Sequence, residues 1–262
     1  MNIHFTDRTL FKQLKVVTLA KVKVGSHMYG TNTEKSDIDY LYIYATSENE
    51  LTSAIQVHHQ LQFIEDGVDH NFVSLHTFLR NCMSGDSTIN FEVLQSGALK
   101  GTKLDWLNKH KDSFITYTII RSYLGFARRD IKHFYKQKDE YNKMKKLGHI
   151  IRGYIYARMM IDGIWDFNTA NTELKNIKLN VSNNKMLRTY ENKISKLRNA
   201  LNEKFNNRTL GYAQHMNVEK GITLTNELNE FCRGYEFKIK QLNLQYFNMN
   251  EFINSFENWV EY

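Results

Sequence analysis

Residues 23–45 read KVGSHMYGTNTEKSDIDYLYIYA, in which a Gly-Ser turn and an Asp-x-Asp pair stand between two apolar runs. Side chains two apart in an extended chain share a face, so Asp37 and Asp39 are expected to project together where the second run begins. Adjacent carboxylates repel unless a cation lies between them, and a few oxygen ligands facing a phosphate suit Mg2+. Gly25 allows close backbone approach to a ligand, and Ser26 adds a hydroxyl. The stretch therefore predicts a site for a metal ion and a triphosphate.

The simpler alternative is a strand–turn–strand in which both aspartates are solvated loop residues. Asp37 and Asp39, however, lead straight into an apolar run, where an unpaired charge is costly. This placement favours the metal site over the solvated loop.

The spacing resembles the signature of the nucleotidyltransferase superfamily of DNA polymerase beta, which is Gly-Ser, a short helix and then Asp-x-Asp. Within it, the stretch is most similar to predicted nucleotidyltransferases related to the RNA-repair-pathway polymerase-beta-like family, which read Gly-Ser-x-x-Tyr-Gly and then Ser-Asp-x-Asp. Tyr29, Gly30 and Ser36 fall on that longer pattern. The resemblance implies an α+β fold, in which a polymerase-beta-like core with a small mixed sheet precedes an α-helical domain. It also implies that Gly25, Ser26, Tyr29 and Ser36 bind nucleotide.

The composition is that of a globular protein with a sizeable core, with 262 residues of which 42% are hydrophobic and 13% aromatic. No apolar run approaches the roughly eighteen residues of a membrane span, and the N-terminal stretch lacks the apolar core of a signal peptide. Cys82 and Cys232 lie far apart without ligand-like neighbours, so both are expected to be reduced core residues. The sequence thus predicts a cytoplasmic protein without a membrane partner.

Charge is distributed unequally along the chain. Residues 1–100 carry 8 Lys and Arg against 11 Asp and Glu, whereas residues 101–262 carry 27 against 17. The formal net charge of +7 thus combines an acidic first part with a basic second part. A basic excess attracts phosphates and nucleic acid, although many lysine-rich helical surfaces have no such partner. Nucleic acid is therefore one candidate partner.

The spacing of apolar residues divides the chain into a mixed half, 1–112, predicted to be the catalytic domain, and a helical half, 113–262. In the first half, strands are expected over 16–24, 38–45, 56–65 and 68–75. Helices are expected over 6–14 and 27–29, from Ser74 or Leu75 to the glycine at 85, and from Ser87 to the glycine at 97.

The second half shows long helical periods. Helices are expected over 114–138, 141–162, 184–205 and 223–242, with an amphipathic tail over 252–260. The stretches over 136–141, 168–184 and 206–220 are polar and are expected to be linkers.

Enzymes of the class that the chain resembles place a third acid on a strand beside the Asp-x-Asp strand. That acid completes a metal site and can accept the proton of the attacking hydroxyl. Asp69 is the predicted third acid, because it begins the strand that follows Gly67. Glu65, Asp66 and Glu92 remain as alternatives, and Glu92 could instead support the site from behind or pair with a lysine.

In the helical half, Lys145, His149 and Arg152 are spaced by four and three residues, so they share one helix face. The resembled family frequently carries Lys-x-x-x-His-x-x-Arg in this half. Arg offers a planar fork and Lys a point charge, so this basic stripe is predicted to bind nucleotide phosphates. Arg128 and Lys132 on the preceding helix could extend it. The alternative is a solvated basic face with one buried histidine.

These features predict a metal-dependent nucleotidyltransferase that moves a nucleoside monophosphate from an NTP, expected to be ATP, to an acceptor hydroxyl. Mg2+ or Mn2+ would be held by Asp37, Asp39 and Asp69. An RNA end suits the basic half and the RNA-repair resemblance, whereas a protein or small-molecule acceptor would use the same chemistry. A non-catalytic nucleotide- or RNA-binding module is the alternative from another class.

Overall fold

The computed structural model describes residues 17–34, 36–45, 60–182 and 184–206. Several expectations fall wholly or partly outside the described residues: the helix over 6–14, the strand residues 16 and 56–59, the linker over 206–220, the helix over 223–242, the tail over 252–260, and Cys232. The described residues form a sheet unit (17–82 and 89–113) and a helical unit (83–88 and 114–206). The predicted division after residue 112 stays a prediction.

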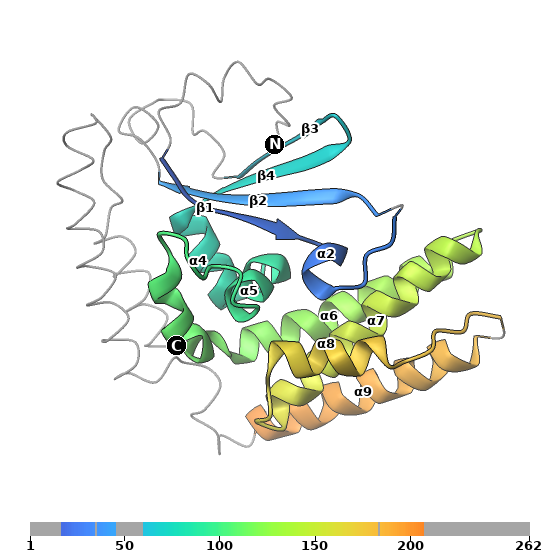
Figure 1. Cartoon of the computed structure of the whole chain (residues 1–262). Coiled ribbons are helices and arrows are strands. Elements are labelled where there is room, and N and C mark those ends of the chain that lie inside the picture. Colours follow the sequence, from blue (N-terminus) through green and yellow to red (C-terminus); the bar gives the residue numbers. More distant parts are fainter. Residues whose placement is uncertain (1–16, 35, 46–59, 183, 207–262) are drawn as a thin grey trace, which may run out of the picture. The chain divides into compact units, whose positions relative to one another are not determined.

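The sheet unit is built on a four-stranded mixed sheet in the order β1-β2-β4-β3 (Figure 1). Its strands are β1 (Val17–Val24), β2 (Ile38–Ala45), β3 (Gln60–Glu65) and β4 (Val68–Ser74). β2 is antiparallel to β1 and parallel to β4, while β3 is antiparallel to β4. All four strands expected from the apolar pattern are present.

A two-residue hairpin connects β3 to β4. Asp66 and Gly67 have positive φ angles of 50° and 75°, which both central residues of a type I′ turn require. Asp tolerates this region and Gly has no Cβ to oppose it, so the Asp-Gly pair suits the turn. The tight return pairs Glu65 with Val68 and thereby sets the register of β4.

Helices cover one side of the sheet. Figure 1 shows α4 (Leu75–Ser84) and α5 (Thr88–Gln95) there. The core is made of buried apolar side chains, among them Leu41, Ile43, Phe78, Leu79, Cys82, Phe91, Val93 and Leu94. Burial of Cys82 as a free thiol agrees with its predicted place in the core. A four-residue helix, α2 (Ser26–Tyr29), follows β1, and a 3-10 helix, η1 (Asp105–Phe114), follows α5.

Aromatic side chains occupy the other face of the sheet. The ring of Tyr42 stacks on that of Phe72 with centroids 4.3 Å apart, and Phe63 stacks on Phe72 at 5.5 Å. Nζ of Lys21 lies 4.3 Å from the centroid of the Tyr40 ring. Cross-strand aromatic pairs of this kind stabilise a sheet. Since side chains alternate along β2, this leaves Asp39 on the opposite face.

The helical unit contains α6 (Tyr117–Phe134), α7 (Glu140–Ile161), α8 (Phe167–Lys175) and α9 (Lys185–Asn206). α6 and α7 lie side by side (Figure 1). They approach closely at Gly153, where a Cβ would lie 2.9 Å from Cβ of Ala127. None of the helices in the described part of the chain is long and apolar enough to cross a bilayer.

The linker expected over 168–184 is wrong in its first part, because α8 occupies Phe167–Lys175. Asn and Thr are weak helix formers, and their abundance there conceals the helix. The side chain of Asp166 caps α8 by accepting a 2.8 Å hydrogen bond from the Thr169 amide, and Phe167 and Ala170 are buried at helical spacing. Capping and packing therefore outweigh low propensity.

Candidate active site

Two aspartates lie side by side on neighbouring parallel strands. Asp39 of β2 is the register partner of Asp69 of β4, so both side chains leave the same face of the sheet. Among the competing acids, Glu65 pairs with Val68 at the end of β3, and Asp66 occupies the hairpin turn. The register therefore favours Asp69 as the third acid over these two.

Gly25 lies against the carboxylate of Asp39. Its φ of 67° and ψ of −145° belong to a backbone region nearly confined to glycine. A Cβ at this position would lie 2.5 Å from Oδ2 of Asp39. The close approach follows from the register, since Val24 is the β1 partner of Asp39. Glycine is thus required both for conformation and for room.

The carboxylates offer a donor set that suits a small hard cation. Within the described part of the chain, Oδ1 of Asp69 is buried without a hydrogen-bond partner, whereas Oδ2 accepts a 2.7 Å bond from Nε2 of Gln62. A buried oxygen without a partner is costly unless a cation or a donor reaches it. Asp37 stands exposed immediately before β2. No group of three or more His, Cys, Asp or Glu side chains among the described residues is arranged to hold a metal ion.

The predicted loop residues shape the approach to these acids. Ser26 opens α2 directly after Gly25. The hydroxyl of Ser36 accepts a 2.8 Å hydrogen bond from the Thr33 amide, and the Ser36 amide donates to the Thr33 carbonyl at 3.0 Å. These bonds close a turn just before Asp37. Nucleotide contacts of Ser26 and Ser36 stay predictions.

Tyr29 joins α2 to α5 inside the sheet unit. Its side chain is buried, and its hydroxyl donates a hydrogen bond to the carboxylate of Glu92, which is fully buried in α5. Of the roles considered for Glu92, this contact favours support of the Gly-Ser turn from behind. A direct contact between Tyr29 and nucleotide stays a prediction.

A buried aspartate that the sequence analysis did not single out organises part of the basic stripe. Asp130 on α6 is fully buried. Its Oδ2 lies 3.1 Å from Nδ1 of His149, and its Oδ1 lies 3.5 Å from Nζ of Lys146. The available signal was one acid in the otherwise basic run around Arg129 and Lys132.

The three residues of the predicted stripe differ in burial. Lys145 is exposed. The side chain of His149 is 29% exposed, whereas Arg152 is only 8% exposed, with its guanidinium carbon 5.8 Å from the centroid of the Phe126 ring. The stripe therefore runs from solvent into the helix pair. Phosphate binding by these residues stays a prediction.

The ionisation of Asp130 and His149 follows from their surroundings. Burial is the largest influence on His149 and lowers its pKa. The hydrogen bond and the charge of Asp130 raise that pKa, the charges of Arg152 and Lys146 lower it, and the pKa is lowered overall. Burial raises the pKa of Asp130, but the hydrogen bond from His149 and the charges of Lys146, His149 and Arg129 outweigh burial and leave that pKa lowered. Near neutral pH, an ionised Asp130 therefore accepts a hydrogen bond from a neutral His149.

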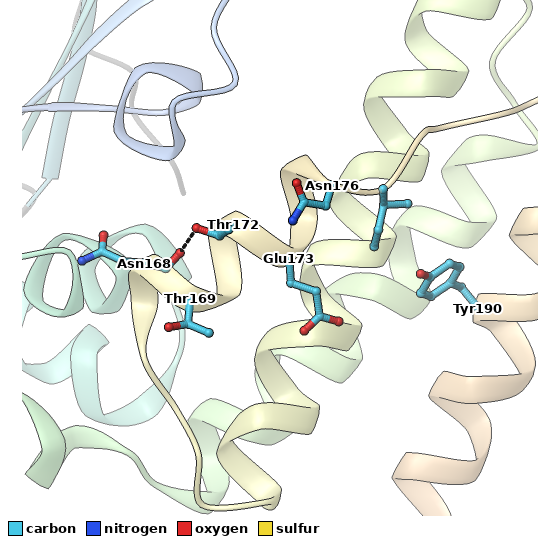
Figure 2. A pocket seen from close by; sticks show the side chains of 7 residues that line it. Asn168, Thr169, Thr172, Glu173, Asn176 and Tyr190 are labelled. Carbon is cyan, nitrogen blue, oxygen red and sulfur yellow. Dashed lines mark hydrogen bonds between the residues drawn. The ribbon is translucent and has the colours of Figure 1, made fainter.

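The helical unit also contains a pocket of about 700 Å3, shown in Figure 2. It is lined by side chains of α8, the segment after it and α9: Asn168, Thr169, Thr172, Glu173, Asn176, Ile177 and Tyr190. The carboxylate of Glu173 accepts a 2.6 Å bond from Nη2 of Arg158. Because that charge is matched, the lining presents mainly amide and hydroxyl groups.

Comparison with known proteins confirms the resemblance seen in the sequence. Residues 8–209 match the family described as "RlaP: RNA repair pathway DNA polymerase beta family". An uncharacterized 38.9 kDa protein from the nrdC-mobD intergenic region of Enterobacteria phage T4 is 24% identical over 131 residues, which are 45% of this chain and 38% of the phage protein. The match thus spans less than half of that relative's length. No solved structure matches the chain significantly.

Proposed function

The chain belongs to the RNA repair pathway DNA polymerase beta family, and from this premise we propose that it is a nucleotidyltransferase. It moves a nucleoside monophosphate from an NTP to an acceptor hydroxyl. The hydroxyl oxygen bonds to the α-phosphorus, the bond from that phosphorus to the bridging oxygen breaks, and pyrophosphate leaves with the electron pair. The observation that carries the proposal is the pairing of Asp39 with Asp69, with Gly25 against the Asp39 carboxylate.

Asp37, Asp39 and Asp69 are the proposed ligands of Mg2+ or Mn2+. Carboxylate oxygens suit either ion, and the buried, unpartnered Oδ1 of Asp69 supports the assignment within the described part of the chain. A metal bound there supplies acidification of the acceptor hydroxyl and charge to offset the pyrophosphate. Asp69 is the proposed acceptor of the hydroxyl proton.

The nucleotide is proposed to be ATP. Gly25 and Ser26 hold its β- and γ-phosphates through close backbone approach and a hydroxyl. Tyr29 and Ser36 keep the loop around them in shape, which their hydrogen bonds support. In the helical unit, Lys145 and Arg152 are the proposed phosphate ligands.

The proposed acceptor is an RNA end. Two observations support it. The description of the family names an RNA repair pathway, and residues 101–262 carry 27 Lys and Arg against 17 Asp and Glu. A basic excess of this kind attracts a polyanion.

The test is transfer of label from each NTP, labelled at the α-phosphate, to RNA in the presence of Mg2+. We expect Asp39→Asn to lower transfer by roughly 100-fold or more, the scale of losing one group that stabilises the transition state. Asp66→Asn is the matched control, because it removes an exposed acid from a turn with φ 50°, which asparagine also tolerates.

The outcomes separate the parts of the proposal. Label on protein or on a small molecule would contradict the proposed RNA acceptor but would still support nucleotidyltransferase activity. Absence of transfer from every NTP would contradict the transferase itself. Full activity of Asp39→Asn would show that the acid pair is not the site.

A further inference from the structure

We propose that Asp130 and His149 form a dyad that binds a ribose hydroxyl, with Nε2 of His149 as the hydrogen-bond acceptor and Asp130 as the positioning residue. The inference rests on the proposed function only in taking the ribose to belong to a nucleotide or an RNA end. It gives His149 a hydroxyl partner instead of a phosphate.

The contact between the two side chains determines which ring nitrogen carries the proton. Oδ2 of Asp130 lies 3.1 Å from Nδ1 of His149, and an ionised carboxylate can only accept. Asp130 stays ionised because Nζ of Lys146 lies 3.5 Å and Nε of Arg129 lies 3.6 Å from its Oδ1. Nδ1 is therefore the donor in this pair, and Nε2 is the nitrogen left for a ligand.

The outer side of the His149 ring can be reached. Its side chain is 29% exposed, against 1% for Asp130, and no described residue makes a hydrogen bond to its Nε2. The ring of Phe126 lies beside it, with centroids 5.8 Å apart and planes inclined by 33°. Asp130 and Phe126 thus hold the ring on one side while the other nitrogen remains accessible.

The charge state of the ring favours a hydroxyl over a phosphate. The charged groups that act on it are Asp130 from α6 and Lys146 and Arg152 from α7, while Arg129 pairs with Asp130. Burial, together with Arg152 and Lys146, holds the pKa of His149 below its ordinary value. A neutral ring with its proton on Nδ1 presents a lone pair at Nε2, which repels phosphate oxygen and accepts a hydrogen bond from a hydroxyl.

A purely structural role is the competing explanation. Asp130 lies between α6 and α7, near the close approach of Gly153 to Ala127, and its ion pairs stabilise that contact. A test must therefore measure a property of binding that would not change if the pair only stabilised the packing of the helices. The presence or absence of ribose hydroxyls on the probe supplies such a readout.

The experiment compares the binding of five probes to the full chain. The probes are ATP, 2′,3′-dideoxy-ATP, inorganic tripolyphosphate, and one RNA oligonucleotide ending either in ribose or in 2′,3′-dideoxyribose. The variants are His149→Ala and Asp130→Asn. Asp139→Asn is the matched control. It removes one carboxylate from the start of α7, the helix that carries His149, and asparagine keeps a capping side chain there.

The expected pattern is a selective loss. His149→Ala and Asp130→Asn should weaken binding of a ribose-bearing probe by roughly three- to tenfold, the scale of one neutral hydrogen bond. The matched dideoxy probe and tripolyphosphate should bind as to wild type, and Asp139→Asn should resemble wild type throughout. Loss confined to ATP identifies the donor's ribose, and loss confined to the RNA identifies that of the acceptor.

Two results would overturn the dyad. Equal weakening of ATP, dideoxy-ATP and tripolyphosphate would make His149 a phosphate ligand, and no change with any probe would leave the pair purely structural. In both cases nucleotide binding by wild type would still support the proposed function. Failure of wild type to bind any probe would contradict both proposals.

A measurement on wild type keeps the inference testable if Asp130→Asn does not fold. Long-range proton–nitrogen correlation spectra near neutral pH report which nitrogen of His149 carries hydrogen. We expect a protonated Nδ1 and an unprotonated Nε2. A ring with its proton on Nε2, or a doubly protonated ring, would overturn the assignment.

Discussion

Gly25 is the residue on which the geometry of the acid pair depends most directly. It ends β1 with a backbone conformation that other residues rarely adopt, and it leaves just enough room for the Asp39 carboxylate. Any side chain at this position would push Oδ2 of Asp39 away. The position of the Asp39 carboxylate therefore depends on the absence of a side chain at Gly25.

Gly25→Ala is expected to lower nucleotide transfer by roughly 100-fold, since displacing a reacting group by about 1 Å can cost that much. The measurement is kcat/KM in the transfer assay. Gly67→Ala is the matched control, because Gly67 also has a positive φ, 75°, but a Cβ there would meet no atom within 4 Å. Equal losses in both variants would point to backbone strain and not to displacement of Asp39.

The Asp130–His149 pair predicts that acid destabilises the fold. The folded state lowers the pKa of His149. The contribution of His149 to the stability of the fold is therefore fully present above the ordinary histidine pKa of about 6.5, and it is lost as pH falls through the lowered pKa. The lowered pKa of Asp130 acts in the same direction at more acid pH. We expect Tm to fall as the pH is lowered from about 7 to about 5, and to fall less in the His149→Gln variant than in wild type. His133→Gln, on the same helix pair, is the control, and identical pH profiles for His149→Gln and wild type would contradict the account.

At the scale of elements, α2 illustrates how a helix too short to persist alone is held in place. A helix of four residues is not stable on its own, because its few hydrogen bonds do not offset the unfavourable free energy of helix nucleation. Gly25 is the N-cap of α2, Gly30 is its C-cap in the left-handed region with φ 63°, and Tyr29 bonds it to Glu92 of α5. The position of Ser26 thus depends on a contact 63 residues away in sequence.

Tyr29→Phe is expected to destabilise the fold by about 2 kcal/mol, because it removes a hydrogen bond from a buried carboxylate. Urea denaturation measures the change in free energy of unfolding. Tyr141→Phe serves as control, since Tyr141 is 67% exposed, and it should change stability little. Equal effects of the two substitutions would show that the bond to Glu92 is not stabilising.

The sequence predicts elements better than contacts between them. β2 has its expected bounds, since alternation and burial are properties of the segment itself. The opposition of Asp39 and Asp69 depends on β4 pairing with β2 in parallel, which no local pattern reports. Asp130 was missed for the same reason, because its partner lies 19 residues away on another helix. α8 was missed because its cap and packing override weak propensity.

At the scale of the whole molecule, the proposed chemistry is divided between two units. The acids belong to the sheet unit, and the basic stripe with Asp130 belongs to the helical unit. Along the sequence, residues 1–100 carry more acidic than basic side chains, and residues 101–262 carry more basic than acidic ones. Such a distribution suits a metal ion in one part and a polyanion on the other.

RNA binding by the full chain is expected to weaken steeply with salt. Contacts to about three phosphates of a single strand would lower the affinity by roughly twentyfold between about 50 and about 200 mM monovalent salt. Filter binding or fluorescence anisotropy with a labelled oligonucleotide measures this slope. An affinity that does not change over this range would contradict an RNA partner bound through its phosphates.

The most direct test of the central claim is a crystal structure of the full chain with Mn2+ and a non-hydrolysable ATP analogue. The account predicts an anomalous peak for the metal within coordinating distance of Asp39 and Asp69, and the triphosphate against Gly25 and Ser26. Metal and nucleotide bound elsewhere, with both carboxylates turned away from them, would contradict it.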